Sequence, residues 1–181
     1  MSMAERFLLD IVSVKLVREA SVPYATKEIT SPDDAVGIFR DFLEDEDREH
    51  MVAMFLTTKN RPTAITTVCI GTLKQCSVHP REVFKAAILS NSAAIILAHN
   101  HPSGDPVPSR VDIEVTRRLS AVGEIIGIEV LDHVVIAEGG YVSMKASGLL
   151  DLGSSVQTHP TKGGVGGRIA RRSPVRYVNP E

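Results

Sequence analysis

The run AAIILA, from Ala93 to Ala98, constrains the fold more than any other segment of the chain. Six consecutive apolar residues are too few for a helix of their own, and they lack the alternation of a strand with one wet face. Such a run is typical of a strand that is covered on both faces of its sheet. We therefore expect a buried central strand that ends at His99, where a loop containing Pro and Gly begins.

Signals for further helices and strands surround this central run. Ser31 is predicted to cap a helix with Pro32 at its first position, and Asp34 completes a variant of the capping box. The buried stripe of this helix is predicted to consist of Ala35, Ile38, Phe39 and Phe42. A further helix is expected over 81–89, and another begins after its cap, Ser109, and ends at about Val122. Strands are expected over 11–17, 51–56, 64–70, 128–136 and 141–144.

The order of these elements mixes strands in hairpins with helices. The strands over 51–56 and 64–70 are expected to form an antiparallel hairpin across 59–62, and the last two strands to pair across Gly139 and Gly140. This order predicts a compact mixed α/β (α+β) sandwich, in which helices cover one largely buried sheet.

Length and composition set limits on the class of protein. A chain of 181 residues, 43% hydrophobic, is expected to form one domain whose core needs no disulfide or structural metal. Cys69 and Cys76 are too few for a disulfide framework or a Cys-rich zinc module. A net charge of −2, 4% aromatic residues and no Trp argue against a basic coat or a base-stacking platform for nucleic acid. The absence of a secretory leader or long apolar span predicts a cytoplasmic protein without a membrane contact.

The last part of the sequence differs in charge and composition from the rest. Residues 151–181 hold five basic and two acidic side chains, and from Gly153 onward they are rich in Gly, Ser and Pro. We interpret 151–181 as a flexible basic tail. Its four arginines permit a weak contact with nucleic acid, and a solvated tail without a fixed role is the alternative. These arginines are Arg168, Arg171, Arg172 and Arg176.

Three potential metal ligands follow the central run. His99 and His101 are two residues apart at the end of an extended segment, so their side chains project to the same face. Asp112 lies in the first turn of the helix that Ser109 caps, and the intervening loop can fold that turn over the end of the strand. Two nitrogens, one oxygen and a place for water are the ligand set of a catalytic zinc. A helix cap is the alternative role for Asp112.

The same segment argues against other metalloenzymes. The triplet His99-Asn100-His101 spells the name of the HNH nucleases, but in those enzymes the three residues are dispersed over a ββα element. A zinc deaminase needs a Glu two residues after its His and a Pro-Cys-x-x-Cys pair, which this sequence lacks. The sequence also lacks the His-Glu-x-x-His helix of many zinc proteases.

The stretch from His99 to Asp112 resembles the JAMM motif of the JAB/MPN+ metalloprotease superfamily. The wider context, over roughly residues 11–150, is similar to the RadC-like branch of that superfamily. The segments that carry this resemblance are Arg48-Glu49-His50, Thr58–Arg61, Gly71–Leu73, His79–Phe84, His99–Ser109, Leu131–His133 and Tyr141–Ser143. With 1–10 as a lead-in, 11–150 is then the metallo-domain.

The resemblance implies a mixed α/β fold of the cytidine-deaminase-like kind. It implies one Zn²⁺ per chain, held by His99, His101 and Asp112 with a water in the fourth position. It also assigns Glu49 as the general base that returns its proton to the leaving amine, and Ser109 as a donor to the developing oxyanion. Spacing alone gives Ser109 an equal claim to be a helix cap.

Position in the sequence supports Glu49 over its acidic neighbours. Residues 44–47 read as a solvated acidic loop, whereas Glu49 opens an apolar strand and can be held rigidly. The remaining histidines of the domain, His50, His79 and His133, are expected to be buried, hydrogen-bonded structural residues. Longer relatives carry a helix-hairpin-helix-like region before this domain, and only about ten residues precede the first expected strand here. We therefore expect little DNA binding of that kind.

Two functions from different classes fit these residues. The first is a zinc-dependent hydrolase of peptide or isopeptide bonds, whose partner is a peptide or protein substrate. The second is a DNA repair or recombination factor, in which zinc serves a nuclease or is auxiliary. An open metal position in a groove beside an exposed strand favours the hydrolase, and a continuous positive surface leading to the metal favours the second function.

Deletion of residues 153–181 tests the interpretation of the tail. We expect the shortened protein to keep its far-UV circular dichroism spectrum and its metal content, because the core and the predicted ligands precede the deletion. Binding to DNA, measured against salt, is expected to weaken, because the arginines supply the available phosphate contacts. Unfolding of the shortened protein, or unchanged DNA affinity, would contradict the interpretation.

Overall fold

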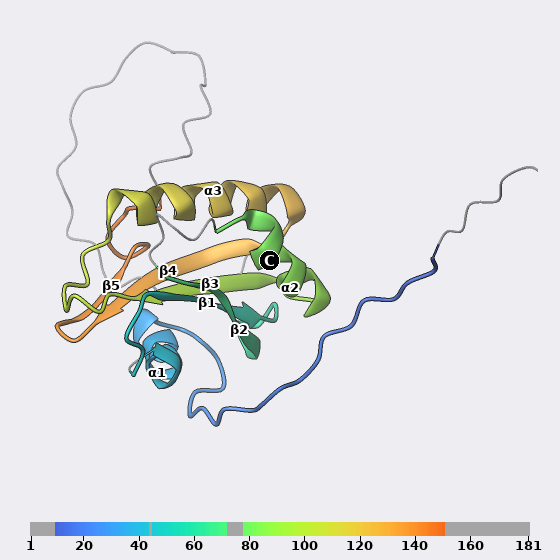
Figure 1. The fold of residues 1–181 in the computed structure, drawn as a ribbon, viewed down its shortest axis with the longest axis horizontal. Helices are drawn as coiled ribbons and strands as arrows, with labels where there is room; N and C mark the ends of the chain where they lie inside the picture. The colour runs from blue at the N-terminus through green and yellow to red at the C-terminus, as the bar shows by residue number, and fades with distance from the viewer. Residues whose placement is uncertain (1–9, 44, 72–77, 151–181) are drawn as a thin grey trace, which may run out of the picture.

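The apolar run becomes β3, the middle strand of a five-stranded sheet (Figure 1). The computed structural model describes residues 10–43, 45–71 and 78–150. The strand order is β2-β1-β3-β4-β5, and among the described strands only β3 and β4 pair in parallel. All seven residues of β3 are buried, as expected for a strand covered on both faces. The strands are β1 (His50–Leu56), β2 (Pro62–Ile70), β3 (Ala94–Asn100), β4 (Glu129–Ala137) and β5 (Gly140–Ser143).

Three helices cover the two faces of this sheet. Helix α1 (Pro32–Leu43) packs on one face, and α2 (Pro80–Leu89) and α3 (Arg110–Ile126) pack on the other (Figure 1). Each face has its own apolar core, so the predicted mixed α/β sandwich is confirmed. The longest described helix, α3, has 17 residues, and no helix in the described ranges has the length and apolar character that crossing a membrane requires.

Helices α1 and α3, for which capping residues are predicted from the sequence, both begin directly after those residues. Ser31 Oγ accepts a hydrogen bond from the Asp34 amide, and an oxygen of Asp34 accepts one from the Ser31 amide. Ser109 and Asp112 form the same reciprocal pair at the start of α3. Helix α3 runs four residues beyond its predicted end, to a left-handed residue at Gly127 (φ 73°).

The strand predicted over residues 11–17 is wrong. This segment has no regular structure and pairs with nothing in the described part of the chain; Ile11 is 102% and Val12 80% exposed. In Figure 1 it runs away from the sheet. Its alternating apolar residues supply β propensity, but a strand forms only where a neighbouring strand accepts its hydrogen bonds.

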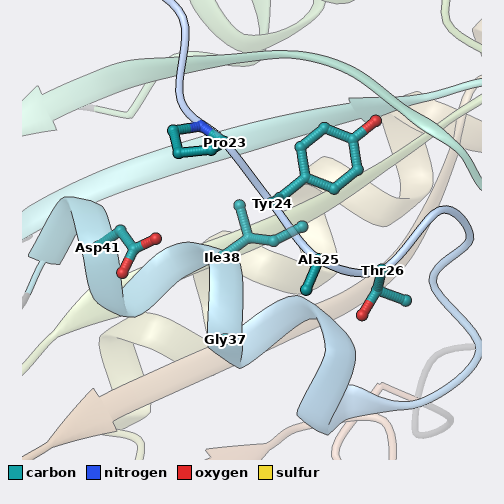
Figure 2. A pocket seen from close by; sticks show the side chains of 7 residues that line it. All are labelled: Pro23, Tyr24, Ala25, Thr26, Gly37, Ile38 and Asp41. Atoms are coloured by element: carbon teal, nitrogen blue, oxygen red, sulfur yellow. The ribbon is translucent and has the colours of Figure 1, made fainter.

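The chain rejoins the domain after this extended segment. Residues 23–26 lie against α1 and, with three residues of that helix, line a cleft of about 530 Å³ (Figure 2). The amide of Ile29 donates to the Asn60 carbonyl at 2.9 Å, and Arg61 forms an ion pair with Glu28 at 2.7 Å. These contacts attach the segment before α1 to the loop between β1 and β2.

Two helical glycines are expected to respond in opposite directions to alanine. A Cβ atom on Gly123 of α3 would lie 2.5 Å from the backbone oxygen of Ile128, whereas one on Gly37 of α1 meets nothing within 4 Å. We expect Gly123→Ala to lower the free energy of unfolding by about 1–3 kcal/mol through overpacking. Gly37→Ala is the matched control and should raise it by about 0.5–1 kcal/mol through helix propensity. Urea denaturation of both variants checks this, and equal shifts would contradict the close packing of α3.

Candidate metal centre

Three predicted ligands meet where β3 ends and α3 begins. The two Nε2 atoms of His99 and His101 lie 3.0 Å apart, and each lies 3.6 Å from Oδ2 of Asp112. Ligands about 2.0–2.1 Å from a tetrahedral zinc are separated by roughly 3.3 Å. The three atoms therefore form a triangle of the size that one zinc ion requires, and His99, His101 and Asp112 are grouped as one potential metal-binding cluster.

The strand and the loop after it place the two histidines. Because side chains alternate along β3, His99 and His101 share one face and Asn100 takes the other. The Asn100 side chain accepts from the His50 amide at 2.6 Å and donates to the Arg48 carbonyl at 2.8 Å. The amide of His101 donates to the Ile136 carbonyl at 2.7 Å, so the residue is held just beyond the paired part of β3.

Burial differs among the three residues. The side chains of His99 and Asp112 are 0% and 3% exposed, whereas that of His101 is 13% exposed. Burial alone would raise the pKa of Asp112, but hydrogen bonds to His101 and His99 outweigh it and hold this pKa well below its usual range. The same carboxylate raises the pKa of His101. The cluster thus presents an ionised carboxylate and favours a positive charge beside it.

The hydrogen bonds behind the cluster show which atoms are free to bind a cation. Nδ1 of His101 lies 2.8 Å from the Asp105 carbonyl, which can only accept, so this nitrogen carries the proton. In the neutral ring, Nε2 then keeps its lone pair and points at the other two ligand atoms. Lone pairs and a carboxylate oxygen at such distances repel one another unless a cation lies between them. The donor set therefore fits a zinc ion.

Glu49 immediately precedes β1, the strand that pairs with β3. The last pair of that ladder is Met51 with His99, and continuing the same antiparallel register by two residues would set Glu49 opposite His101. Directly opposed residues share a face of the sheet, so this register favours a place for Glu49 on the side of His101. Glu49 is half-buried, its carbonyl accepts from the Gly71 amide at 2.8 Å, and its charge helps to raise the pKa of His101.

Ser109 is exposed at the start of α3 and caps it. Its Oγ accepts from the Asp112 amide at 3.3 Å, and Oδ2 of Asp112 accepts from the Ser109 amide at 2.6 Å. Oδ2 is also the carboxylate oxygen that faces His99 and His101. The cap role of Ser109 is thus present, and its role as an oxyanion donor stays a prediction.

The other histidines differ in their surroundings. His133 is 0% exposed, as predicted, and complete burial holds its pKa well below the usual value. His50 is half-buried, and its Nε2 lies 3.2 Å from a carboxylate oxygen of Glu46. The prediction of a buried His79 is wrong: this residue is exposed and caps α2 by accepting from the Arg81 amide at 3.1 Å. The Pro80 after it places it at a helix start, where a polar side chain finds backbone amides.

Thr116 is the residue of this region that sequence reasoning missed. It is 0% exposed, and its Oγ1 lies 2.5 Å from Nδ1 of His133 and donates to the Asp112 carbonyl at 2.6 Å. The available signal was its position four residues after Asp112, which sets it one turn further along the same helix face. A threonine at that spacing also suits ordinary helix packing, so the signal is weak.

Comparison with known proteins gives one family and many similar sequences. The model of the RadC-like JAB domain matches residues 29–149. A UPF0758 protein of Desulforamulus reducens is 51% identical over 134 residues, which cover 74% of this chain and 59% of the relative. UPF0758 proteins of Desulforudis audaxviator and Rubrobacter xylanophilus are 51% and 49% identical, over 67% and 77% of this chain and 53% and 62% of their own lengths. The chain thus spans between half and two thirds of these relatives.

Replacement of single histidines tests the metal centre. We expect the purified protein to bind close to one zinc per chain, and His99→Ala and His101→Ala each to abolish stoichiometric binding, because each removes one of three ligands. His79→Ala is the control, since His79 lies outside the cluster. Elemental analysis measures the metal content. Full zinc in both cluster variants would show that the ligands are other residues.

Proposed function

The chain belongs to the RadC-like JAB domain family, and on this basis we propose that it is a zinc-dependent hydrolase that cleaves peptide or isopeptide amide bonds. The observation that carries the proposal is the triangle of His99 Nε2, His101 Nε2 and Asp112 Oδ2, with sides of 3.0–3.6 Å. Two imidazoles and a carboxylate that leave one position open form the ligand set of hydrolytic zinc sites.

The surrounding residues supply the proton transfers that amide hydrolysis needs. His99, His101 and Asp112 would hold a zinc ion, which would lower the pKa of a coordinated water to about 7 and polarise a carbonyl. Glu49, whose charge acts on His101, would accept the proton of the attacking water and pass it to the nitrogen of the leaving amine. The hydroxyl of Ser109, at the start of α3, donates to the oxyanion that forms on the substrate carbonyl.

A pocket on the α1 side of the sheet, which touches the cluster only through His101, has an acidic lining that disfavours a nucleic acid. The pocket has a volume of about 560 Å³ and is bordered by the loop before β1 and the end of β4. Its ionised lining residues are one cation and three carboxylates, namely Arg40, Glu46, Asp47 and Glu138. Carboxylates repel the phosphates on which nucleic-acid affinity depends. The alternative repair function rests on the basic tail, and residues 151–181 lie outside the described residues.

Replacement of Glu49 separates catalysis from metal binding. Glu49→Gln keeps nearly the same size and can hydrogen-bond a water, but it cannot accept a proton. We expect this variant to retain zinc and stability and to lose hydrolysis by about 10²- to 10⁴-fold. Asp45→Asn, at an exposed residue of the preceding acidic loop, is the matched control and should hydrolyse at the parent rate. Rates are measured on hits from peptide and isopeptide libraries at near-neutral pH with zinc.

Two results would change the assignment of Glu49. A Glu49→Gln variant as fast as the parent would mean that another group is the base. A Glu49→Gln variant without zinc would make Glu49 a ligand. Ser109→Ala is expected to be milder, with a rate loss on the order of 10²-fold and a loss of about 1 kcal/mol in stability from the missing cap.

A further inference from the structure

A line of hydrogen bonds runs behind the metal cluster and connects two of its ligands. Nδ1 of His99 lies 2.7 Å from Nε2 of His133, and Nδ1 of His133 lies 2.5 Å from Oγ1 of Thr116. Oγ1 of Thr116 lies 2.6 Å from the carbonyl oxygen of Asp112. The line thus begins on a ligand of β3, passes through β4, and ends on the backbone of a ligand in α3.

We propose that His133 and Thr116 are positioning residues that fix the tautomer of His99, so that its Nε2 lone pair faces the metal. This inference rests on the metal centre of the proposed function. It assigns a role beyond packing to a buried histidine and a buried threonine. Both act from behind the ligands, because their hydrogen bonds go to Nδ1 of His99 and to the Asp112 carbonyl and not to the three atoms that face the metal.

The single hydroxyl proton of Thr116 sets the direction of the line. The Asp112 carbonyl has no proton, so the contact of 2.6 Å requires Thr116 to donate to it. Two other acceptors lie near this hydroxyl: Sδ of Met144 at 3.4 Å, which is more distant and weak, and Nδ1 of His133 at 2.5 Å, which accepts only in the tautomer protonated at Nε2. With its proton committed to the carbonyl, Oγ1 accepts the proton that Nδ1 of His133 carries.

This direction then fixes which nitrogen carries the proton in each of the two imidazole rings. A neutral imidazole has one N–H, so His133 protonated at Nδ1 has a lone pair at Nε2. That lone pair accepts from Nδ1–H of His99, which leaves the lone pair of neutral His99 on Nε2. This is the atom 3.0 Å from His101 Nε2 and 3.6 Å from Asp112 Oδ2. The opposite direction would leave the Asp112 carbonyl without the Thr116 proton and put N–H of His99 among the ligand atoms.

Burial makes this arrangement sensitive to the loss of one member. His99, His133 and Thr116 are each 0% exposed, so water does not replace a missing partner without a rearrangement. In such surroundings a hydrogen bond is stronger and an unpaired polar group is less favourable than at the surface. Loss of an outer partner of a metal-binding histidine typically lowers metal affinity by about 10- to 100-fold. Thr116 controls His99 through His133, at a distance of two hydrogen bonds.

The test uses the full chain and removes the Thr116 hydroxyl. Thr116→Val keeps the shape of the side chain, and Thr116→Ser restores the hydroxyl. Thr63→Val is the matched control, because the Thr63 hydroxyl also donates to a backbone carbonyl, that of Phe55 at 3.1 Å, in a different part of the sheet. Two readouts are measured: Co²⁺ affinity by chelator competition, and the ¹⁵N shifts of His99 in metal-free protein at mildly alkaline pH.

We expect the parent His99 to show a protonated Nδ1 and an unprotonated Nε2. Thr116→Val should lower Co²⁺ affinity by about 10- to 100-fold and produce a mixture of His99 tautomers, while Thr116→Ser and Thr63→Val stay close to the parent in both readouts. A structural role alone would lower the thermal midpoint of Thr116→Val and leave the tautomer and the affinity unchanged.

The outcomes also separate this inference from the proposed function. A parent His99 protonated at Nε2, or unchanged Co²⁺ affinity and tautomer in folded Thr116→Val, overturns the inference. If Thr116→Val does not fold, the His99 tautomer of the parent protein tests the inference by itself. The direction of the hydrogen bonds predicts that tautomer, protonated at Nδ1, without any variant. Expected tautomer and affinity results together with no hydrolysis of any peptide or isopeptide would overturn the proposed function and leave the positioning role in place.

Discussion

Two imidazole nitrogens and a carboxylate oxygen are held 3.0–3.6 Å apart at the end of β3, and the surrounding structure is arranged to keep them there. Such atoms repel one another without a cation, so the protein must hold them rigidly from behind. The buried central strand supplies His99, and backbone bonds on either side fix His101. Asp112 lies in the first turn of α3, so the three ligand atoms come together only because α3 begins close to the end of β3.

The carboxylate of Asp112 has two roles that the sequence presents as alternatives. Its Oδ2 accepts from the Ser109 amide in the capping box and faces both histidines. A helix N-terminus favours negative charge, which helps to keep a nearly buried carboxylate ionised. The cap also limits the rotation of the side chain, so the bond that begins α3 orients the oxygen that faces the histidines.

Asn100, the residue between the two histidines, holds the backbone around the candidate base Glu49. Asn100 projects to the opposite face of β3 and bonds to the His50 amide and the Arg48 carbonyl, on both sides of Glu49. These bonds fix the backbone on both sides of Glu49 beside the end of β3. The triplet His99-Asn100-His101 thus combines two candidate ligands with a clamp for the candidate base.

The sequence by itself determined the features that depend on neighbours along the chain. These are the buried run of β3, the two histidines on one face, and the reciprocal caps of α1 and α3, because periodicity and capping are local. Tertiary structure decided the rest. Residues 11–17 have β propensity but no partner strand among the described residues, Glu49 comes near His101 only because β1 pairs with β3, and the link from His99 to Thr116 crosses three elements. Hydrogen bonds between distant segments form only after packing brings their elements together, and no local pattern encodes them.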